Sequence, residues 1–361
     1  MIKVRNVSLL AATLLPVSIM PVLCNAQLSA NATVFATGLE SPRGLTFGPD
    51  GSLYVAEGGM GGTMTTTDAQ CTQVPTPVGP YSGGFTARIS KIDALGHVTT
   101  VINGLPSSQT SPAQGSLVSG VSDVKFIGNT LYALTAGAGC SHGLQHTTNG
   151  IFKVNGNNTW TRIADLSAFQ KAHPVANPDL ADFEPDGTWY SMVAVRGQLI
   201  AVEPNHQEID SVDPSTGAIR RLIDMSKLSS AWVGPTSIAY HGNFYIGFLT
   251  PFPIVDGTSK ITKMTPSGQV KTVVTGLTTV LGVAFDHEGR MYVLENTTGA
   301  GNMFPTPNTG VVLRVTAHGL ETIATGLSLP TAMTFGPDGA LYVSNSGFGP
   351  PTGEIVRIDV R

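Results

Sequence analysis

Four short runs of apolar or alternating residues form a unit that recurs along the chain, and Gly, Pro, Asn or Asp bounds each run. Alternation with a period of two between turn residues is typical of antiparallel β-strands. One run of the unit is the clearest, and its six copies stand at residues 53–57, 131–135, 199–203, 244–248, 291–295 and 341–345. Six copies of one strand predict six similar sheets.

The other runs of the unit surround this one. A tight turn, such as Gly48-Pro49-Asp50-Gly51, joins each copy to a preceding run, which we expect to be the innermost strand of its sheet. These innermost strands are expected at 44–47, 121–126, 190–195, 236–240, 281–285 and 331–335. Third strands are expected at 87–93, 150–154, 208–213, 260–265, 311–316 and 354–359. Fourth strands are expected at 97–102, 160–166, 219–225, 270–277 and 320–327.

The fourth run has no sixth copy near the C-terminus. A matching segment stands near the N-terminus, where residues 33–39 (TVFATGL) resemble residues 321–327 (ETIATGL). An N-terminal strand that completes the last sheet closes a ring and leaves no unpaired edge. The sequence therefore predicts an all-β fold, a six-bladed β-propeller with four-stranded antiparallel blades. The blades are expected at approximately 40–102, 121–166, 190–225, 236–277, 281–327, and 331–361 with 33–39.

The first 26 residues differ from the rest of the chain. Lys3 and Arg5 precede an apolar stretch, and Ala26 stands before a suitable cleavage point. These features indicate a secretory signal peptide, so we expect residues 27–361 to form a single propeller in the periplasm or outside the cell. The alternative is an uncleaved anchor, but Pro16 and Pro21 interrupt a stretch that is shorter than the roughly 20 residues needed to span a bilayer. No membrane span is expected after cleavage.

Composition narrows the choice of partners. The chain has 42 Gly, 24 Pro and only 12% charged residues, as expected for a turn-rich β protein. Removal of Lys3 and Arg5 with the signal peptide leaves 18 basic residues against 24 acidic ones, a net charge of −6. Nucleic acid and anionic lipid are therefore poor partners, because both are bound by basic surfaces.

Two cysteines, Cys71 and Cys140, remain after cleavage. They lie in equivalent loops of neighbouring blades, and pairs of thiols in an oxidising compartment are usually joined. We therefore predict a Cys71–Cys140 disulfide. Two unpaired, buried cysteines are the alternative.

Long loops gather on one face of the predicted propeller. The insertions at 58–86, 103–120 and 169–188, and one near Cys140, all follow a second strand or lead into a first strand, which places them on the same side. We expect a ligand to bind on this face around the mouth of the central tunnel. The candidate ligand-binding residues are Arg43, Glu57, Trp189, Tyr190, Glu203, Asn205, His206, Glu295 and Asn296.

Three second strands, in alternate blades, end in a carboxylate: Glu57, Glu203 and Glu295. With neighbouring Asn side chains they form a candidate site for calcium or another divalent metal. Crowded carboxylates can also hold a proton for acid–base chemistry. The alternative is that each Glu caps backbone N–H groups in its own loop or pairs with a cation.

No catalytic residue is identified from motifs. The histidines lack a metal-ligand spacing such as HExxH, and neither a nucleophile elbow nor a phosphate-binding loop is present. Trp189, Tyr190 and Trp232 fit an aromatic ligand platform and equally fit wedges between blades.

Several longer motifs carry a family resemblance. Residues 38–45 (GLESPRGL) precede 48–57 (GPDGSLYVAE), a Gly-rich loop carries Cys71, and 203–206 (EPNH) leads to 209–213 (IDSVD). Over nearly all of the mature length, the chain resembles the ScyD/ScyE family of secreted bacterial propellers. Its repeat is also similar to NHL and gluconolactonase-type propellers. The resemblance implies the fold and export, and it implies no particular reaction.

Two functions fit these observations. The first is a binding module for a small molecule, a protein or a carbohydrate, which uses the long-loop face; fold alone supports many functions. The alternative is a divalent-metal-dependent hydrolase or lactonase-like enzyme at the tunnel mouth. We expect the binding module, and the sequence leaves open whether the protein is an enzyme.

Overall fold

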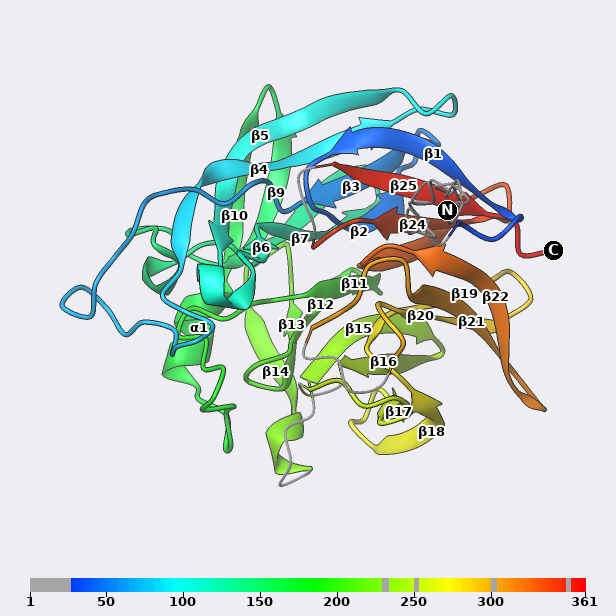
Figure 1. Cartoon of the computed structure of the whole chain (residues 1–361). Helices are drawn as coiled ribbons and strands as arrows, with labels where there is room; N and C mark the ends of the chain where they lie inside the picture. The colour runs from blue at the N-terminus through cyan, green and yellow to red at the C-terminus, as the bar shows by residue number, and fades with distance from the viewer. Residues whose placement is uncertain (1–26, 229–233, 250–252, 300–303, 349–351) are drawn as a thin grey trace, which may run out of the picture.

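The computed structural model describes residues 27–228, 234–249, 253–299, 304–348 and 352–361, so the predicted signal peptide and Trp232 lie outside the described residues. Six antiparallel sheets form a ring (Figure 1), which confirms the predicted six-bladed β-propeller. Five sheets have four strands, and the first has a short fifth strand.

The strands follow the repeat of the sequence. Blade 1 has β2 Pro42–Phe47, β3 Leu53–Glu57, β4 Ser82–Ile92, β5 Val98–Gln109 and β6 Val118–Ser119. Blade 2 has β7 Val121–Ile127, β8 Thr130–Thr135, β9 Gly150–Gly156 and β10 Thr159–Asp165. Blade 3 has β11 Ser191–Val195, β12 Gln198–Glu203, β13 Glu208–Val212 and β14 Ile219–Asp224.

The last three blades are built in the same way. Blade 4 has β15 Gly234–His241, β16 Asn243–Leu249, β17 Ser259–Met264 and β18 Val270–Leu277. Blade 5 has β19 Val280–Phe285, β20 Met291–Glu295, β21 Gly310–Thr316 and β22 Gly319–Leu327. Blade 6 has β23 Ala332–Phe335, β24 Leu341–Asn345, β25 Gly353–Ile358 and β1 Ala32–Leu39. A short α-helix, α1 Leu166–Ala172, follows blade 2.

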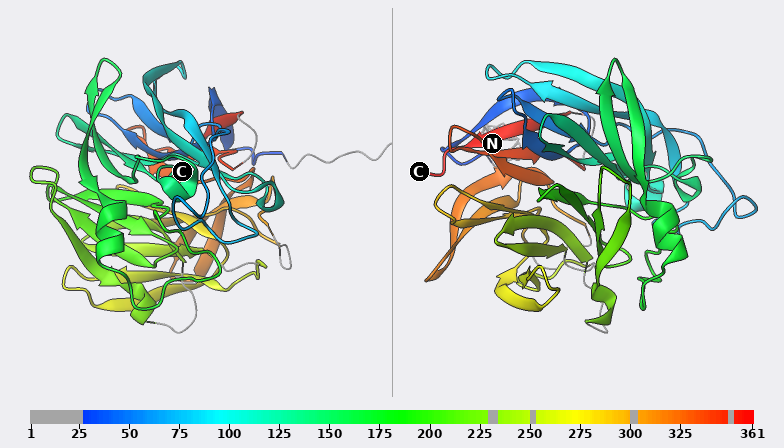
Figure 2. Two further views of the ribbon diagram at one scale, coloured as in Figure 1. Left: turned by 90° about the vertical axis from the view of Figure 1, so that its left-hand side faces the viewer. Right: turned by 180° about the vertical axis from the view of Figure 1, so that it is seen from behind.

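Blade 1 departs from the predicted repeat. β4 and β5, cyan in Figures 1 and 2, extend to 11 and 12 residues, and β6 pairs with the end of β5. The interpretation of 103–120 as a plain connection is therefore wrong for 103–109 and 118–119. Gly83 allows the extension, because a Cβ there would lie 2.5 Å from the carbonyl oxygen of His142. The extended parts of β4 and β5 are rich in Gly and Ser, and apolar and polar residues do not alternate there. The sequence signal for a strand is therefore weak.

A separate hydrophobic core lies at each of the six junctions between neighbouring blades. Twisted sheets in a ring bury their apolar faces only against the next blade. Trp189, for example, is fully buried with Tyr132 and Leu199 between blades 2 and 3. None of the helices in the described part of the chain is long and apolar enough to span a membrane.

β1 closes the ring as predicted. It pairs with β25 from Ala32 opposite Ile358 to Leu39 opposite Gly353, so both ends of the described chain meet in blade 6 (Figure 1). Ala32 packs into the core between blades 5 and 6, and Leu39 packs into the core between blades 6 and 1. One strand therefore stabilises two junctions.

We predict that Leu39→Ala lowers the free energy of unfolding by about 2–5 kcal/mol, because the side chain is fully buried at the closing junction. Val34→Ala in the same strand is the control, since Val34 is 47% exposed and its loss changes stability by less than about 0.5 kcal/mol. Denaturant unfolding measures both variants. Equal effects would show that β1 does not hold the ring closed.

Candidate functional site

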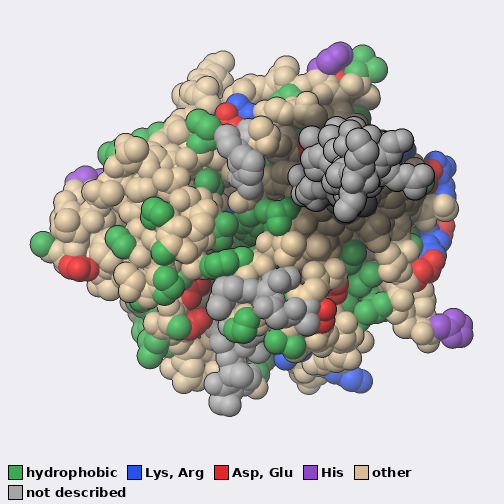
Figure 3. All heavy atoms as spheres, viewed as in Figure 1, with side chains coloured by type: hydrophobic (Ala, Val, Ile, Leu, Met, Phe, Trp, Pro, Cys, Tyr) green, Lys and Arg blue, Asp and Glu red, His purple; other side chains and the backbone are tan. Residues whose placement is uncertain are grey.

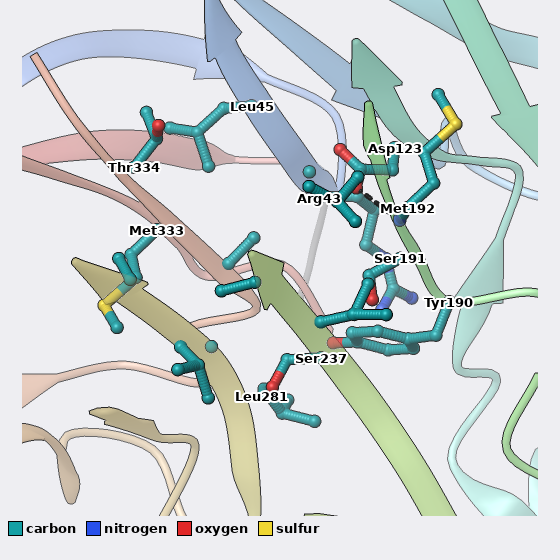
Figure 4. Close-up of a pocket in the computed structure, with 18 of the residues that line it drawn as sticks. Arg43, Leu45, Asp123, Tyr190, Ser191, Met192, Ser237, Leu281, Met333 and Thr334 are labelled. Atoms are coloured by element: carbon teal, nitrogen blue, oxygen red, sulfur yellow. Dashed lines mark hydrogen bonds between the residues drawn. The ribbon is translucent and has the colours of Figure 1, made fainter. Parts of the chain in front are cut away.

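The innermost strands of the six blades enclose a channel of about 320 Å³. Residues from β2, β7, β11, β15, β19 and β23 form its wall, and Figure 4 shows part of this lining. Each of these strands follows a connection from the preceding blade, so all six begin at the face of the long loops. The first residues of these strands therefore form the mouth of the channel on that face.

Arg43 lies at this mouth in a β-bulge, where the pairing of β2 with β3 shifts between Pro42 and Leu45. Bulges commonly redirect a side chain in this way. The Arg43 guanidinium donates a hydrogen bond to the carbonyl oxygen of Val118 and lies 4.2 Å from the ring centroid of Phe348. Arg43 is only 6% exposed, and burial lowers the pKa of its guanidinium. Within the described residues, no carboxylate forms an ion pair with it.

Tyr190, which directly precedes β11 of blade 3, lies at the same mouth. Its ring centroid lies 6.0 Å from the guanidinium carbon of Arg43, and its hydroxyl donates to the carbonyl oxygen of Thr331, in blade 6, at 3.1 Å. Burial raises the pKa of Tyr190 to about 12, so the hydroxyl remains protonated at neutral pH. Of the candidate residues, Arg43 and Tyr190 are the two that line the channel together (Figure 4).

Asp123 and Lys125, both on β7, add a balanced pair of charges to the channel wall. The Nζ atom of Lys125 lies 2.5 Å from Oδ1 of Asp123, and the backbone N–H of Met192 in blade 3 donates to Oδ2 at 2.8 Å. Burial raises the pKa of Asp123, and the Lys125 charge opposes this shift. Gly44 makes room for the carboxylate, since a Cβ there would lie 2.0 Å from Oδ1.

Sequence reasoning missed Asp123 and Lys125, although a signal was present. The expected innermost strand at 121–126 (VSDVKF) is the one that carries charges, while 44–47, 190–195, 236–240, 281–285 and 331–335 carry none. Because innermost strands line the channel, a charge in this run marks the channel wall. Phe348 was also missed, and no pattern in its loop pointed to the channel.

Glu57, Glu203 and Glu295 occupy equivalent places at the ends of β3, β12 and β20, and all three are buried. Each accepts a hydrogen bond from a backbone N–H in the connection that leads into its own blade. The donors are the N–H groups of Glu40, Thr188 and Thr278, at 2.5, 2.9 and 2.7 Å. Asn345, at the same place in blade 6, accepts from the N–H of Ser328 at 2.8 Å. In each of these blades, the side chain that ends the second strand thus caps a backbone N–H group of the preceding connection.

A metal ion shared by these three carboxylates does not fit this arrangement. Their oxygens accept hydrogen bonds from groups within three separate blades, and the Glu57 carboxylate also forms an ion pair with Arg88 at 2.8 Å. Across the described segments, no group of three or more His, Cys, Asp or Glu side chains is placed to hold a metal ion. We therefore derive no chemistry through a metal here.

The remaining candidates make structural contacts in the described residues. Trp189 is one of the wedges between blades. The amide of Asn205 donates to the Asp182 carboxylate at 2.8 Å, and Nε2 of His206 lies 2.9 Å from the carbonyl oxygen of Glu184. Nδ2 of Asn296 donates to the carbonyl oxygen of Pro330 at 2.7 Å. The three polar side chains stabilise the loops around the mouth.

The long loops are tied to one another. Cys71 and Cys140 form a disulfide with their Cα atoms 6.2 Å apart, which confirms the predicted bond between the loops of blades 1 and 2. On the face seen in Figure 3, acidic and basic side chains lie in small, mixed groups and form no large patch of one sign.

A buried polar chain continues from this link into blade 3. The hydroxyl of Tyr81 donates to Oε1 of Glu184 at 2.5 Å, Oε2 of Glu184 lies 3.6 Å from Nε2 of His142, and Nδ1 of His142 lies 2.8 Å from Oγ of Ser108. Burial lowers the pKa of His142 to about 4 and raises the pKa of Glu184 well above its usual range. Ser, His and Glu are residue types of a hydrolytic triad, but Ser108 and His142 are fully buried, so this chain stabilises the loops.

We predict a pH-dependent stability difference between the wild-type protein and Glu203→Gln. Burial raises the pKa of Glu203 in the folded protein from 4.5 to about 7. The contribution of this side chain to the free energy of unfolding is therefore fully present below pH 4.5 and is lost as the pH rises through 7. As the pH rises from about 5 to 8, the free energy of unfolding of the variant should increase by roughly 2–3 kcal/mol relative to that of the wild-type protein. Denaturant unfolding at each pH measures the difference. Glu288→Gln, at an exposed turn, is the control, and a pH-independent difference for Glu203→Gln would contradict the expectation.

Comparisons with known proteins support the fold. No protein-family model matches the chain, and no curated protein matches it. A structural genomics protein of unknown function from Bacteroides thetaiotaomicron is similar at 12% identity with a TM-score of 0.56, over 92% of this chain and 77% of that one. A putative oxidoreductase (glucose dehydrogenase) from Thermus thermophilus is similar at 16% identity with a TM-score of 0.54, over 91% and 99%.

A putative gluconolactonase is similar at 13% identity with a TM-score of 0.50, over 92% of this chain and 93% of that one. Likeness at these identities concerns the fold alone, because one fold supports many unrelated activities. The comparisons thus support the propeller fold of the chain and go no further than the fold.

Proposed function

We propose that the protein binds a small anionic molecule, which enters the central channel from the long-loop face and is held by Arg43. The observation that carries this proposal is the state of Arg43: its guanidinium is buried at the channel mouth and has no carboxylate partner within the described residues. A buried, unpaired charge is unfavourable unless a partner is supplied. A carboxylate is a suitable partner, because the planar guanidinium can donate two parallel hydrogen bonds to it.

The surroundings of Arg43 support this reading. Phe348 lies against the guanidinium and the Tyr190 hydroxyl forms a hydrogen bond with it, and neither side chain carries a negative charge at neutral pH. Asp123 is already paired with Lys125. The volume of about 320 Å³ is at the lower end of the range of about 300–1,000 Å³ for small-molecule sites, which favours a ligand of a few heavy atoms.

We predict that butanoate raises the melting temperature of the wild-type protein and that Arg43→Met weakens butanoate binding by at least about tenfold, because a charge-assisted hydrogen bond contributes roughly 1.5–3 kcal/mol. Isothermal titration calorimetry at constant ionic strength, with chloride as the reference anion, measures the affinity. The unliganded Arg43→Met variant should be as stable as the wild-type protein or more stable, since a buried charge is replaced by an apolar side chain.

Arg314→Met is the matched control, because Arg314 pairs with Glu321 on the outer strands of blade 5. This variant should bind butanoate as the wild-type protein does. Butanoate binding that is unaffected by Arg43→Met would refute the role of Arg43, and the absence of any carboxylate binding would refute the proposed function.

We also propose that the protein works outside the cytoplasm and belongs to the ScyD/ScyE family. The Cys71–Cys140 disulfide supports export, because such bonds persist in oxidising compartments. The apolar N-terminal stretch and the motifs at 38–45 and 48–57 support the same conclusion. N-terminal sequencing of the protein from its native host should begin at Gln27, and a mature chain that retains residues 1–26 would contradict export by cleavage.

A further inference from the structure

We infer that the channel is selective for monoanions over dianions and that Asp123 sets this selectivity by neutralising Lys125. The inference rests on the proposed function, since it concerns the anion held by Arg43. It assigns to Asp123 a role in specificity, and it narrows the ligand to a monocarboxylate or an equivalent anion with one negative charge.

A count of charges in the channel carries the inference. Among the described residues that form its wall, the Asp, Glu, His, Lys and Arg side chains are Arg43, Asp123 and Lys125. Tyr190 does not contribute a charge, because burial raises its pKa to about 12. The pair formed by Asp123 and Lys125 sums to zero, so one positive charge, that of Arg43, remains without a partner.

Burial makes this count decisive. Arg43 and Asp123 are 6% and 3% exposed, so water screens their charges poorly. One carboxylate on Arg43 brings the net charge of the occupied channel to zero. A second negative charge on the ligand would lose its hydration and find Lys125 already neutralised, which is unfavourable in a desolvated site.

The backbone holds Asp123 in place for this role. Oδ2 accepts the N–H of Met192 from the neighbouring blade, and Figure 4 shows this bond beside Arg43. Gly44, which follows Arg43, leaves space that a Cβ would take from Oδ1. The Arg43 segment and the Asp123 carboxylate are thus packed directly together, and both face the same channel.

The test compares butanoate with succinate, which has the same number of carbon atoms and a second carboxylate. At pH 7.5 and constant ionic strength, calorimetry on the wild-type protein should give an affinity for butanoate at least about tenfold higher than for succinate, as expected from the cost of an unpaired buried charge. Asp123→Asn keeps the shape of the side chain and removes its charge, which leaves two unpaired cations in the channel. The ratio of the butanoate affinity to the succinate affinity should then fall by at least about tenfold.

The matched control is Asp50→Asn, which removes the carboxylate of an ion pair with Lys91 on the exposed surface, where Nζ and Oδ2 lie 2.6 Å apart. It should leave the butanoate-to-succinate ratio unchanged. A wild-type affinity for succinate equal to or above that for butanoate would overturn the inference and leave the proposed anion site standing. An unchanged ratio in folded Asp123→Asn would overturn the role of Asp123, and if that variant does not fold, the wild-type comparison still decides the selectivity.

Discussion

Packing between neighbouring blades is the constraint on which the rest of this protein depends. A single four-stranded sheet cannot bury both of its faces, and here each face is covered only by the next sheet of the ring. The six junction cores therefore need one another, because a missing contact at any junction exposes two apolar faces. The same constraint holds the innermost strands at fixed positions, so that side chains from blades 1, 2 and 3 meet in one channel.

Much of this fold is predictable from the sequence, because its strands repeat one local pattern. Copies such as Leu53–Glu57 and Leu341–Asn345 share their alternation and the turn before them, and the structure places both as second strands. The same reasoning fails for β5 beyond Ile102, where Gly and Ser replace the alternating pattern and contacts with neighbouring loops decide the conformation.

The candidate site was harder to predict, because a repeat fixes where a residue lies and not which way its oxygen atoms are directed. Glu57, Glu203 and Glu295 end three equivalent strands, and a sequence cannot distinguish three carboxylates that converge from three that each cap a loop. Arg43 was identified by its place at the mouth. Its isolation from carboxylates became visible only with the packing of Phe348 and Val118 around it. The buried carboxylates Glu203 and Glu295 of this face accept hydrogen bonds from backbone N–H groups of the loops, whereas Arg43 donates to a backbone carbonyl and has no carboxylate partner among the described residues.

The closing strand also has a consequence for the order of events during synthesis. β1 ends at Leu39 and its partner β25 begins at Gly353, so the other five blades lie between them in the sequence. These five blades must therefore be synthesised before the first strand can pair. Until then β25 in the sixth blade presents an open edge that could pair with another chain, and the core between blades 6 and 1 lacks Leu39. The ring therefore closes late in synthesis, after the strands of the other five blades are available to pair and pack.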